Sequence, residues 1–90
     1  MKDLIFYEAK KFMETYGEVV QEENCLRTHG VSAEGIDITA AYLEFFGFPP
    51  QKKIEENGEI TVLLAGEGDD ERRLVYSAED ETLTLFWKET

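Results

Sequence analysis

Apolar residues near the start of the chain recur at i, i+4, i+7 and i+8. This spacing places them on one face of a helix, where they stack above one another. The sequence therefore predicts a helix over 2–16, ended by Gly17 in the left-handed conformation. The apolar stripe consists of Ile5, Ala9, Phe12, Met13 and Tyr16.

The segment 18–30 carries mixed signals. The Val-Val pair at 19–20 favours a strand, whereas Gln-Glu-Glu at 21–23 favours a helix. The His-Gly pair at 29–30 is typical of a turn. We expect a short helix over 18–26, with an irregular strand as the alternative.

A second helical stripe precedes the double proline Pro49-Pro50. It predicts a helix over 38–46, with Asp37 as the N-cap and Gly47 just past the C-terminal end. Alternation of Ile36 and Ile38 with polar residues leaves a short strand over 35–39 as the alternative. The residues of the stripe are Ile38, Tyr42, Phe45 and Phe46.

After the two prolines, which neither a helix nor a central strand can easily cross, the pattern changes to alternation. Alternating runs predict strands over 59–65, 72–77 and 82–88. Their connections are short and rich in turn residues, so consecutive strands should pair as antiparallel hairpins. The turn dipeptide Asn57-Gly58 would add a fourth strand over 52–56, with Ile54 pointing inward.

These elements define an α+β fold in which N-terminal helices pack on one face of a C-terminal three- to four-stranded antiparallel meander. We expect residues 1–90 to form a single domain, with 1–48 mainly helical and 51–90 forming the sheet. The alternative architecture is a winged helix. Because the predicted helix over 38–46 contains no Lys or Arg, a winged-helix version would have to bind protein rather than DNA.

Charge and composition exclude several classes of protein. The chain carries 20 Asp and Glu against 9 Lys and Arg, a formal net charge of -11, so we expect no direct binding to a phosphate backbone. No apolar run approaches the ~20 residues of a membrane-spanning helix, and no secretory signal is visible. A single cysteine fits a reducing compartment. We therefore expect a cytoplasmic protein with no membrane partner.

One pair of residues suits nucleophilic chemistry. Cys25 and His29 are the only Cys and His, and their spacing of four would place them on one face of a helix. The same pair would equally serve as half of a zinc site, but a structural zinc needs four ligands and the chain offers no further Cys or His. The segment 66–71 lacks the ligand spacing of a calcium loop. We expect no metal, no cofactor and no catalysis, and a Cys/His-dependent enzyme remains the third hypothesis.

Carboxylates gather at the turns of the predicted meander. Consecutive turns of a meander lie at opposite ends of the sheet, so the segment 55–59 should join the turn at 79–81. Rows of carboxylates on a rigid sheet resemble nucleic-acid phosphates and suit a basic groove on another protein. We hypothesise an inhibitor of a basic nucleic-acid-handling protein, of the kind that phages encode, by analogy of size and charge. The alternative is that the acidity only keeps the protein in solution. The predicted partner-binding residues are Glu67, Asp69, Asp70, Glu71, Glu79, Asp80 and Glu81.

Aromatic residues crowd the segment 42–50. One short helix cannot turn all of them toward the core, and exposed aromatics often anchor protein interfaces. The second hypothesis is therefore an adaptor or a homodimer that uses this surface, with ordinary core filling as the competing explanation. The residues of the surface are Tyr42, Phe45, Phe46 and Phe48.

Overall fold

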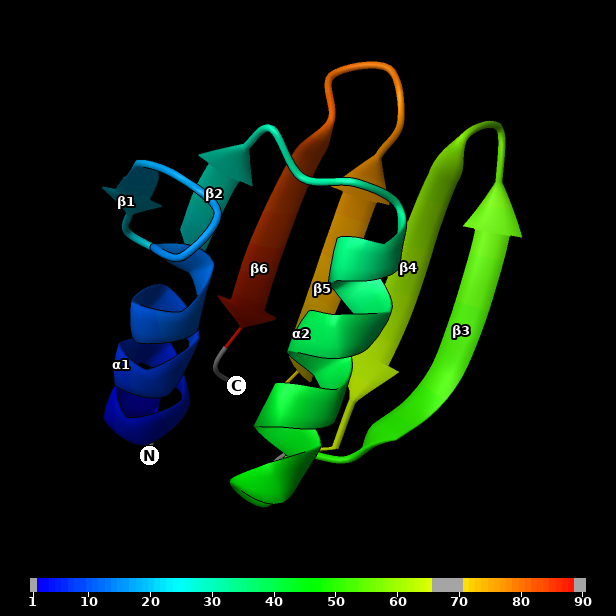
Figure 1. Cartoon of the computed structure of the whole chain (residues 1–90). Coiled ribbons are helices and arrows are strands. Elements are labelled where there is room, and N and C mark those ends of the chain that lie inside the picture. Colours follow the sequence, from blue (N-terminus) through cyan, green and yellow to red (C-terminus); the bar gives the residue numbers. More distant parts are fainter. Residues whose placement is uncertain (1, 66–70, 89–90) are drawn as a thin grey trace.

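The computed structural model describes residues 2–65 and 71–88, and the side chains of 7–65 and 72–87. Figure 1 shows two helices on one side of a single sheet. The elements in chain order are α1 (Lys2–Met13), β1 (Val19–Glu22), β2 (Cys25–His29), α2 (Glu34–Phe45), β3 (Pro50–Glu56), β4 (Glu59–Leu64), β5 (Glu71–Ser77) and β6 (Thr82–Lys88).

The sheet has six strands in the order β1-β2-β6-β5-β4-β3, and every neighbouring pair is antiparallel. The α+β class, the antiparallel sheet and the N-terminal helices are as predicted, but the sheet has six strands rather than three or four. Strands β3 to β6 form the predicted meander, and the fourth strand begins at the second proline, Pro50, two residues earlier than predicted. The additional strands β1 and β2 come from the N-terminal half and join the sheet beside β6 (Figure 1).

The prediction of a helix over 18–26 is wrong, because this segment folds as the β1–β2 hairpin. Leu26 and Thr28 alternate into the core while Arg27 remains partly exposed, a period of two that only a strand allows. The polar residues 21–23 lie at the exposed end of the edge strand β1 and in the turn, where they bury nothing. The hairpin also lies between α1 and α2 in the sequence, so the two helices do not form the helix-turn-helix of a winged-helix protein.

Helix α1 ends at Met13, three residues earlier than predicted. The backbone N–H groups of Thr15 and Tyr16 donate to the carbonyls of Phe12 and Met13, each at 3.0 Å, and these i to i+3 bonds tighten the chain into a turn. Gly17 does not adopt the left-handed conformation that was expected of it. Among the glycines that the structure describes, those with positive φ are Gly30, Gly47 and Gly58.

Helix α2 begins at Glu34, four residues before the predicted start, so the alternative strand over 35–39 is not formed. Asp37 lies in the first turn, and the N-cap position is held by Ala33 without a side-chain hydrogen bond. The predicted C-terminal end is confirmed. Gly47 has φ +96°, its N–H donates to the Glu44 carbonyl and that of Phe48 donates to the Leu43 carbonyl, each at 3.0 Å. This pair of bonds is a Schellman motif.

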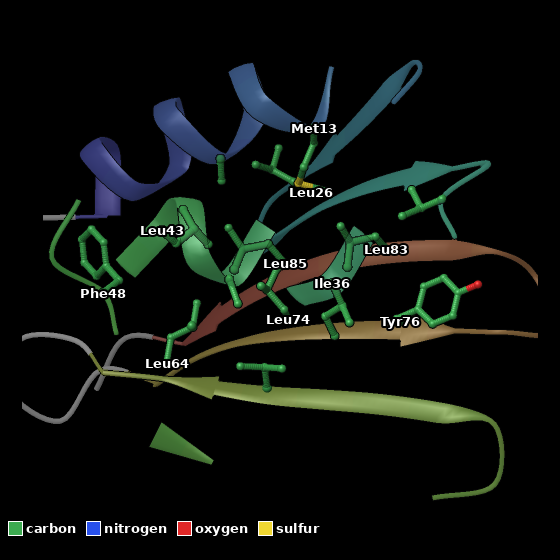
Figure 2. Close-up of a cluster of buried hydrophobic side chains, with 14 of the residues drawn as sticks. Met13, Leu26, Ile36, Leu43, Phe48, Leu64, Leu74, Tyr76, Leu83 and Leu85 are labelled. Atoms are coloured by element: carbon green, nitrogen blue, oxygen red, sulfur yellow. The ribbon is translucent and has the colours of Figure 1, made fainter. Parts of the chain in front are cut away.

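One hydrophobic core joins both halves of the chain (Figure 2). On α2, Ile36, Ala40 and Leu43 face the sheet, whereas the predicted stripe through Ile38 and Phe45 faces solvent. The buried residues of the core are Ala9, Met13, Leu26, Val31, Ile36, Ala40, Leu43, Phe48, Val62, Leu64, Leu74, Tyr76, Leu83, Leu85 and Trp87.

The strand registers fix which side chains face the helices. Val62, Leu74 and Leu85 stand opposite one another across β4, β5 and β6 and are all buried, as the alternation predicted. On β3 the phase differs from expectation. Lys53 is paired with Val62 and shares the helix-covered face, so Ile54 lies on the opposite, open face and is 36% exposed.

Candidate functional site

The turns β3–β4 and β5–β6 lie side by side at one end of the sheet. The N–H of Ala78 donates to the carbonyl of Gly58 at 3.0 Å, which fastens one turn to the other. The N–H of Val31 donates to the carbonyl of Glu81 at the same distance, which ties the loop before α2 to this end. We call this region the acidic end. Its exposed carboxylates belong to Glu55, Glu56, Glu59, Glu79, Asp80 and Glu81.

This arrangement agrees with the expectation that 55–59 and 79–81 share one end of the meander. Glu59 stands opposite Ser77, directly before the β5–β6 turn. Tight backbone geometry holds the turn residues in place. Asn57 and Gly58 both have positive φ, at 49° and 77°, as a two-residue hairpin turn of the primed type requires. Glu81 also has positive φ, at 53°, which directs its carbonyl to Val31.

A hollow of about 350 Å³ opens beside these turns, between the start of α2 and the β3–β4 hairpin. Its floor includes Ile60, which is half-buried, and Tyr76, which is 4% exposed. In Figure 2 the ring of Tyr76 lies at this end of the core. Glu55 stands opposite Ile60 on the face of the hollow, whereas Glu56 and Glu59 pair with each other on the opposite face and border the hollow at the turn. The lining residues are Ala33, Glu55, Glu56, Asn57, Gly58, Glu59, Ile60, Tyr76 and Ala78.

An apolar floor beside an exposed carboxylate suits a Lys or Arg side chain. The aliphatic stem of such a residue would lie against Ile60 and Tyr76, and its cationic head would meet the Glu55 carboxylate on the same face. His29 is nearby in the sheet, with its Nδ1 3.0 Å from the Thr82 hydroxyl. Thr82 also donates to the Asp80 carbonyl at 3.2 Å, so its side chain helps to hold the β5–β6 turn.

Four of the predicted partner-binding residues belong to the β4–β5 connection and the start of β5. Glu67, Asp69 and Asp70 lie outside the described residues, and Glu71 begins β5 with a side chain that is not described. Of the predicted partner-binding carboxylates, Glu79, Asp80 and Glu81 are placed together in one exposed turn. Sequence reasoning did not find the hollow, because its floor and rim come from segments far apart in the chain.

The four predicted aromatic residues do not form one surface. Phe48 is 7% exposed and belongs to the core, whereas Phe45 is 86% exposed. Tyr42 and Phe46 lie between these extremes and pack against the core, and Tyr42 also contacts α1. The ring of Tyr42 stacks on Phe12 at 4.4 Å between centroids, and its hydroxyl donates to Glu8 Oε2 at 3.0 Å.

The exposed apolar surface of α2 is instead a stripe along its outer face. Ile38 and Phe45 are seven residues apart, two helical turns, and are 53% and 86% exposed. Tyr7 on α1 is also exposed, at 63%. The sequence contained this signal, because α2 carries apolar residues on two faces and only one of them can meet the sheet.

Cys25 and His29 lie on β2 rather than on a helix. Four residues along a strand span ~13 Å, so the thiol and the imidazole are not brought together as a nucleophile and its base. Burial, with the nearby Glu22 carboxylate adding to it, raises the pKa of the Cys25 thiol above 9.0. A raised pKa keeps the thiol protonated, the opposite of what activation requires.

Among the described side chains, no group of three His, Cys, Asp or Glu residues is arranged to hold a metal ion. Neither α1 nor α2 has the length and apolar character that a helix needs to cross a membrane. No family model matches the chain, and no curated protein or solved structure shows significant similarity to it.

Proposed function

We propose that this protein is a small interaction module whose acidic end binds a basic surface on another protein. The observation that supports the proposal is the hollow of about 350 Å³, with Ile60 and Tyr76 at its floor and Glu55 on the same face of the sheet. Acidic side chains alone would also serve solubility. A concave apolar floor beside Glu55 adds a place for one basic side chain of the partner to be inserted.

The more specific form of the proposal is inhibition by imitation of nucleic acid. A basic groove that normally holds phosphates would accept the carboxylates of the acidic end, and the partner would then lose its nucleic acid. The formal charge of -11 favours rapid association with such a groove.

The test is capture of partners from a nuclease-treated lysate with wild-type protein and with the triple variant Glu79→Lys, Asp80→Lys, Glu81→Lys. We expect the wild type to retain basic proteins that salt releases, and the variant to lose them. The matched control is Glu14→Lys, Glu18→Lys, Glu23→Lys, which changes the net charge equally at exposed positions elsewhere. Equal loss in both variants would show that only total charge matters.

A defined probe locates the binding surface. Titration of the labelled protein with an arginine-rich peptide should shift the backbone amide resonances of 55–60 and 78–82 first. Shifts spread evenly over the acidic residues would contradict a specific site. For the inhibitor form, the protein should displace nucleic acid from a captured partner, and simultaneous binding of both would refute it.

A second candidate function is an adaptor that binds through the outer stripe of α2. The observation that favours it is the 86% exposure of Phe45 together with the 53% exposure of Ile38. Phe45→Asp should abolish a salt-resistant partner while the fold remains intact, because this side chain contributes almost nothing to the core. A partner that is lost in the Glu79, Asp80, Glu81 variant and retained in Phe45→Asp would exclude this candidate.

A further inference from the structure

Strand β3 forms one edge of the sheet, and all seven of its residues are exposed. One side of the strand pairs with β4, and no strand within the described residues pairs with the other side. Figure 1 shows β3 as an outer strand beyond which no other element lies. A long exposed edge of this kind offers unpaired backbone groups to another strand.

The charges of β3 follow an unusual order. Two cations, Lys52 and Lys53, precede Ile54, and two anions, Glu55 and Glu56, follow it. When such a strand pairs antiparallel with a copy of itself about Ile54, each cation meets an anion. Lys52 stands opposite the partner's Glu56, Lys53 stands opposite the partner's Glu55, and the two isoleucines meet at the centre.

The backbone of β3 allows this register. A two-residue hairpin loop closes on a hydrogen-bonded pair, here Glu56 with Glu59. Because the direction of the backbone groups alternates along a strand, Glu56, Ile54 and Lys52 direct their N–H and C=O toward β4. Lys53 and Glu55 then direct theirs away from it. In the register centred on Ile54, Lys53 would exchange both backbone hydrogen bonds with the partner's Glu55, and the same exchange recurs on the other side of the axis.

The side chains also meet on the correct faces. Lys53 and Glu55 lie on the helix-covered face, opposite Val62 and Ile60 of β4, whereas Lys52, Ile54 and Glu56 lie on the open face. Antiparallel partners share a face, so each proposed ion pair joins residues on the same side of the sheet. In the monomer, Lys53 Nζ lies 3.2 Å from Asp37 Oδ1 and 3.5 Å from Glu55 Oε1, so this ammonium group already has carboxylates beside it.

We propose that this protein forms a two-fold symmetric dimer in which β3 pairs antiparallel with β3 of a second copy, in the register centred on Ile54. Charged residues often protect an edge strand from association. Protection against an identical edge works best with charges of one sign, because like charges then face each other. The order Lys-Lys-Ile-Glu-Glu does the reverse and favours a copy of the same strand.

Distance decides between local attraction and overall repulsion. Each copy carries a formal charge of -11, so long-range repulsion opposes the dimer. At physiological salt the screening length is ~8 Å. Side chains opposite each other in a ladder have Cβ atoms ~5 Å apart, within that length, whereas the molecule extends 33 Å along its longest axis. Screening therefore removes only part of the attraction between the pairs at the edge, whereas it removes most of the repulsion between the more distant charges.

The test is sedimentation analysis of charge-reversed variants. Lys52→Glu with Lys53→Glu makes the edge wholly acidic, and Glu55→Lys with Glu56→Lys makes it wholly basic. Each variant alone should dimerise at least about tenfold more weakly than the wild type, because opposed pairs become like-charged. An equimolar mixture of the two should form a heterodimer, and the fourfold variant that exchanges both pairs should recover the homodimer.

Controls separate this outcome from general effects of charge. Lys10→Glu with Lys11→Glu changes the net charge by the same amount on α1 and should leave the dimer unchanged. If the variants fail to fold, hydrogen exchange of the wild type gives the answer. The N–H groups of Lys53 and Glu55 should become protected as the protein concentration rises, while exposed turn amides do not.

A monomer at every accessible concentration, or a dimer insensitive to both reversals, would overturn the proposal. Glu55 and Glu56 belong both to the acidic end and to the dimer register, so the two proposals are tested with different residues. Partner capture uses Glu79, Asp80 and Glu81 of the β5–β6 turn, which the register does not pair, and failure of one test therefore does not decide the other.

Discussion

At the scale of single residues, burial rather than residue type decides what a side chain can do. Phe45 and Phe48 are three positions apart and chemically identical, yet one is 86% exposed and the other 7%. The Schellman turn between them reverses the chain at Gly47, so that Phe48 returns to the core beside Leu43 while Phe45 points outward.

Cys25 carries a prediction at this scale. Burial, followed by the Glu22 carboxylate, raises its pKa above 9.0 in the folded protein. The unfolded thiol loses its proton first as pH rises, so its contribution to stability is fully present below 9.0 and is lost above it. Urea unfolding as a function of pH should therefore show the wild type losing stability relative to Cys25→Ala in the alkaline range. Glu22→Gln should reduce the effect only in part, because burial is the larger cause.

At the scale of elements, the end of α2 depends on one glycine. Gly47 has φ +96° with no atom within 4 Å of the position that a Cβ would occupy, so the cost of a side chain there is conformational rather than steric. Gly47→Ala should lower the free energy of unfolding by about 1–2 kcal/mol. Gly17→Ala is the matched control, since Gly17 lacks positive φ and its Cβ would meet only ordinary contacts. Equal losses, measured by chemical denaturation, would contradict this account.

Sequence periodicity predicted an element correctly where the segment carries only one pattern of apolar residues. The strands over 59–65, 72–77 and 82–88 were predicted from alternation and are formed, although on β6 Thr82 and Thr84 are buried together with Leu83 and Leu85. The β1–β2 hairpin was missed because β1 is a short edge strand that buries little, so its polar residues resemble those of an exposed helix. On α2 the correct helix was predicted with the wrong inward face, because Ile36 and Ile38 compete and only the tertiary contacts choose between them.

The candidate site was predictable to a similar degree. Alternation of turns in a meander was enough to place Glu59 near Glu79. The hollow itself was not predictable, since its floor requires the register of Ile60 against Tyr76 and its opening depends on the position of Ala33. Such relations arise only when three separate segments pack together.

At the scale of the whole molecule, excess negative charge works against the folded state. The screening length shrinks from ~30 Å to ~8 Å between ~0.01 M and ~0.15 M salt, whereas the molecule measures 33 × 26 × 23 Å. Repulsion therefore spans the protein at low salt and not at high salt.

Sodium chloride should accordingly raise the melting temperature by about 4–8 °C, the equivalent of about 1 kcal/mol for a chain of this size. Exposed pairs such as Arg27 with Glu22, at 2.9 Å, weaken in salt but contribute little. The variant Glu14→Gln, Glu18→Gln, Glu23→Gln should show a smaller response in the same thermal melts. A melting temperature that falls with added salt would contradict dominant repulsion.

The position of β6 has a consequence for how the chain acquires its structure during synthesis. Strand β2 pairs with β6, and Thr28 stands opposite Leu83, so the N-terminal hairpin finds its neighbour only in the last of the described elements. On the ribosome, α1, β1 and β2 emerge early and must wait, with their apolar faces uncovered, until β6 has left the exit tunnel. Loops that close over so many residues also form slowly. A chaperone that recognises exposed apolar segments would therefore have the longest time to act on the nascent N-terminal half of the chain.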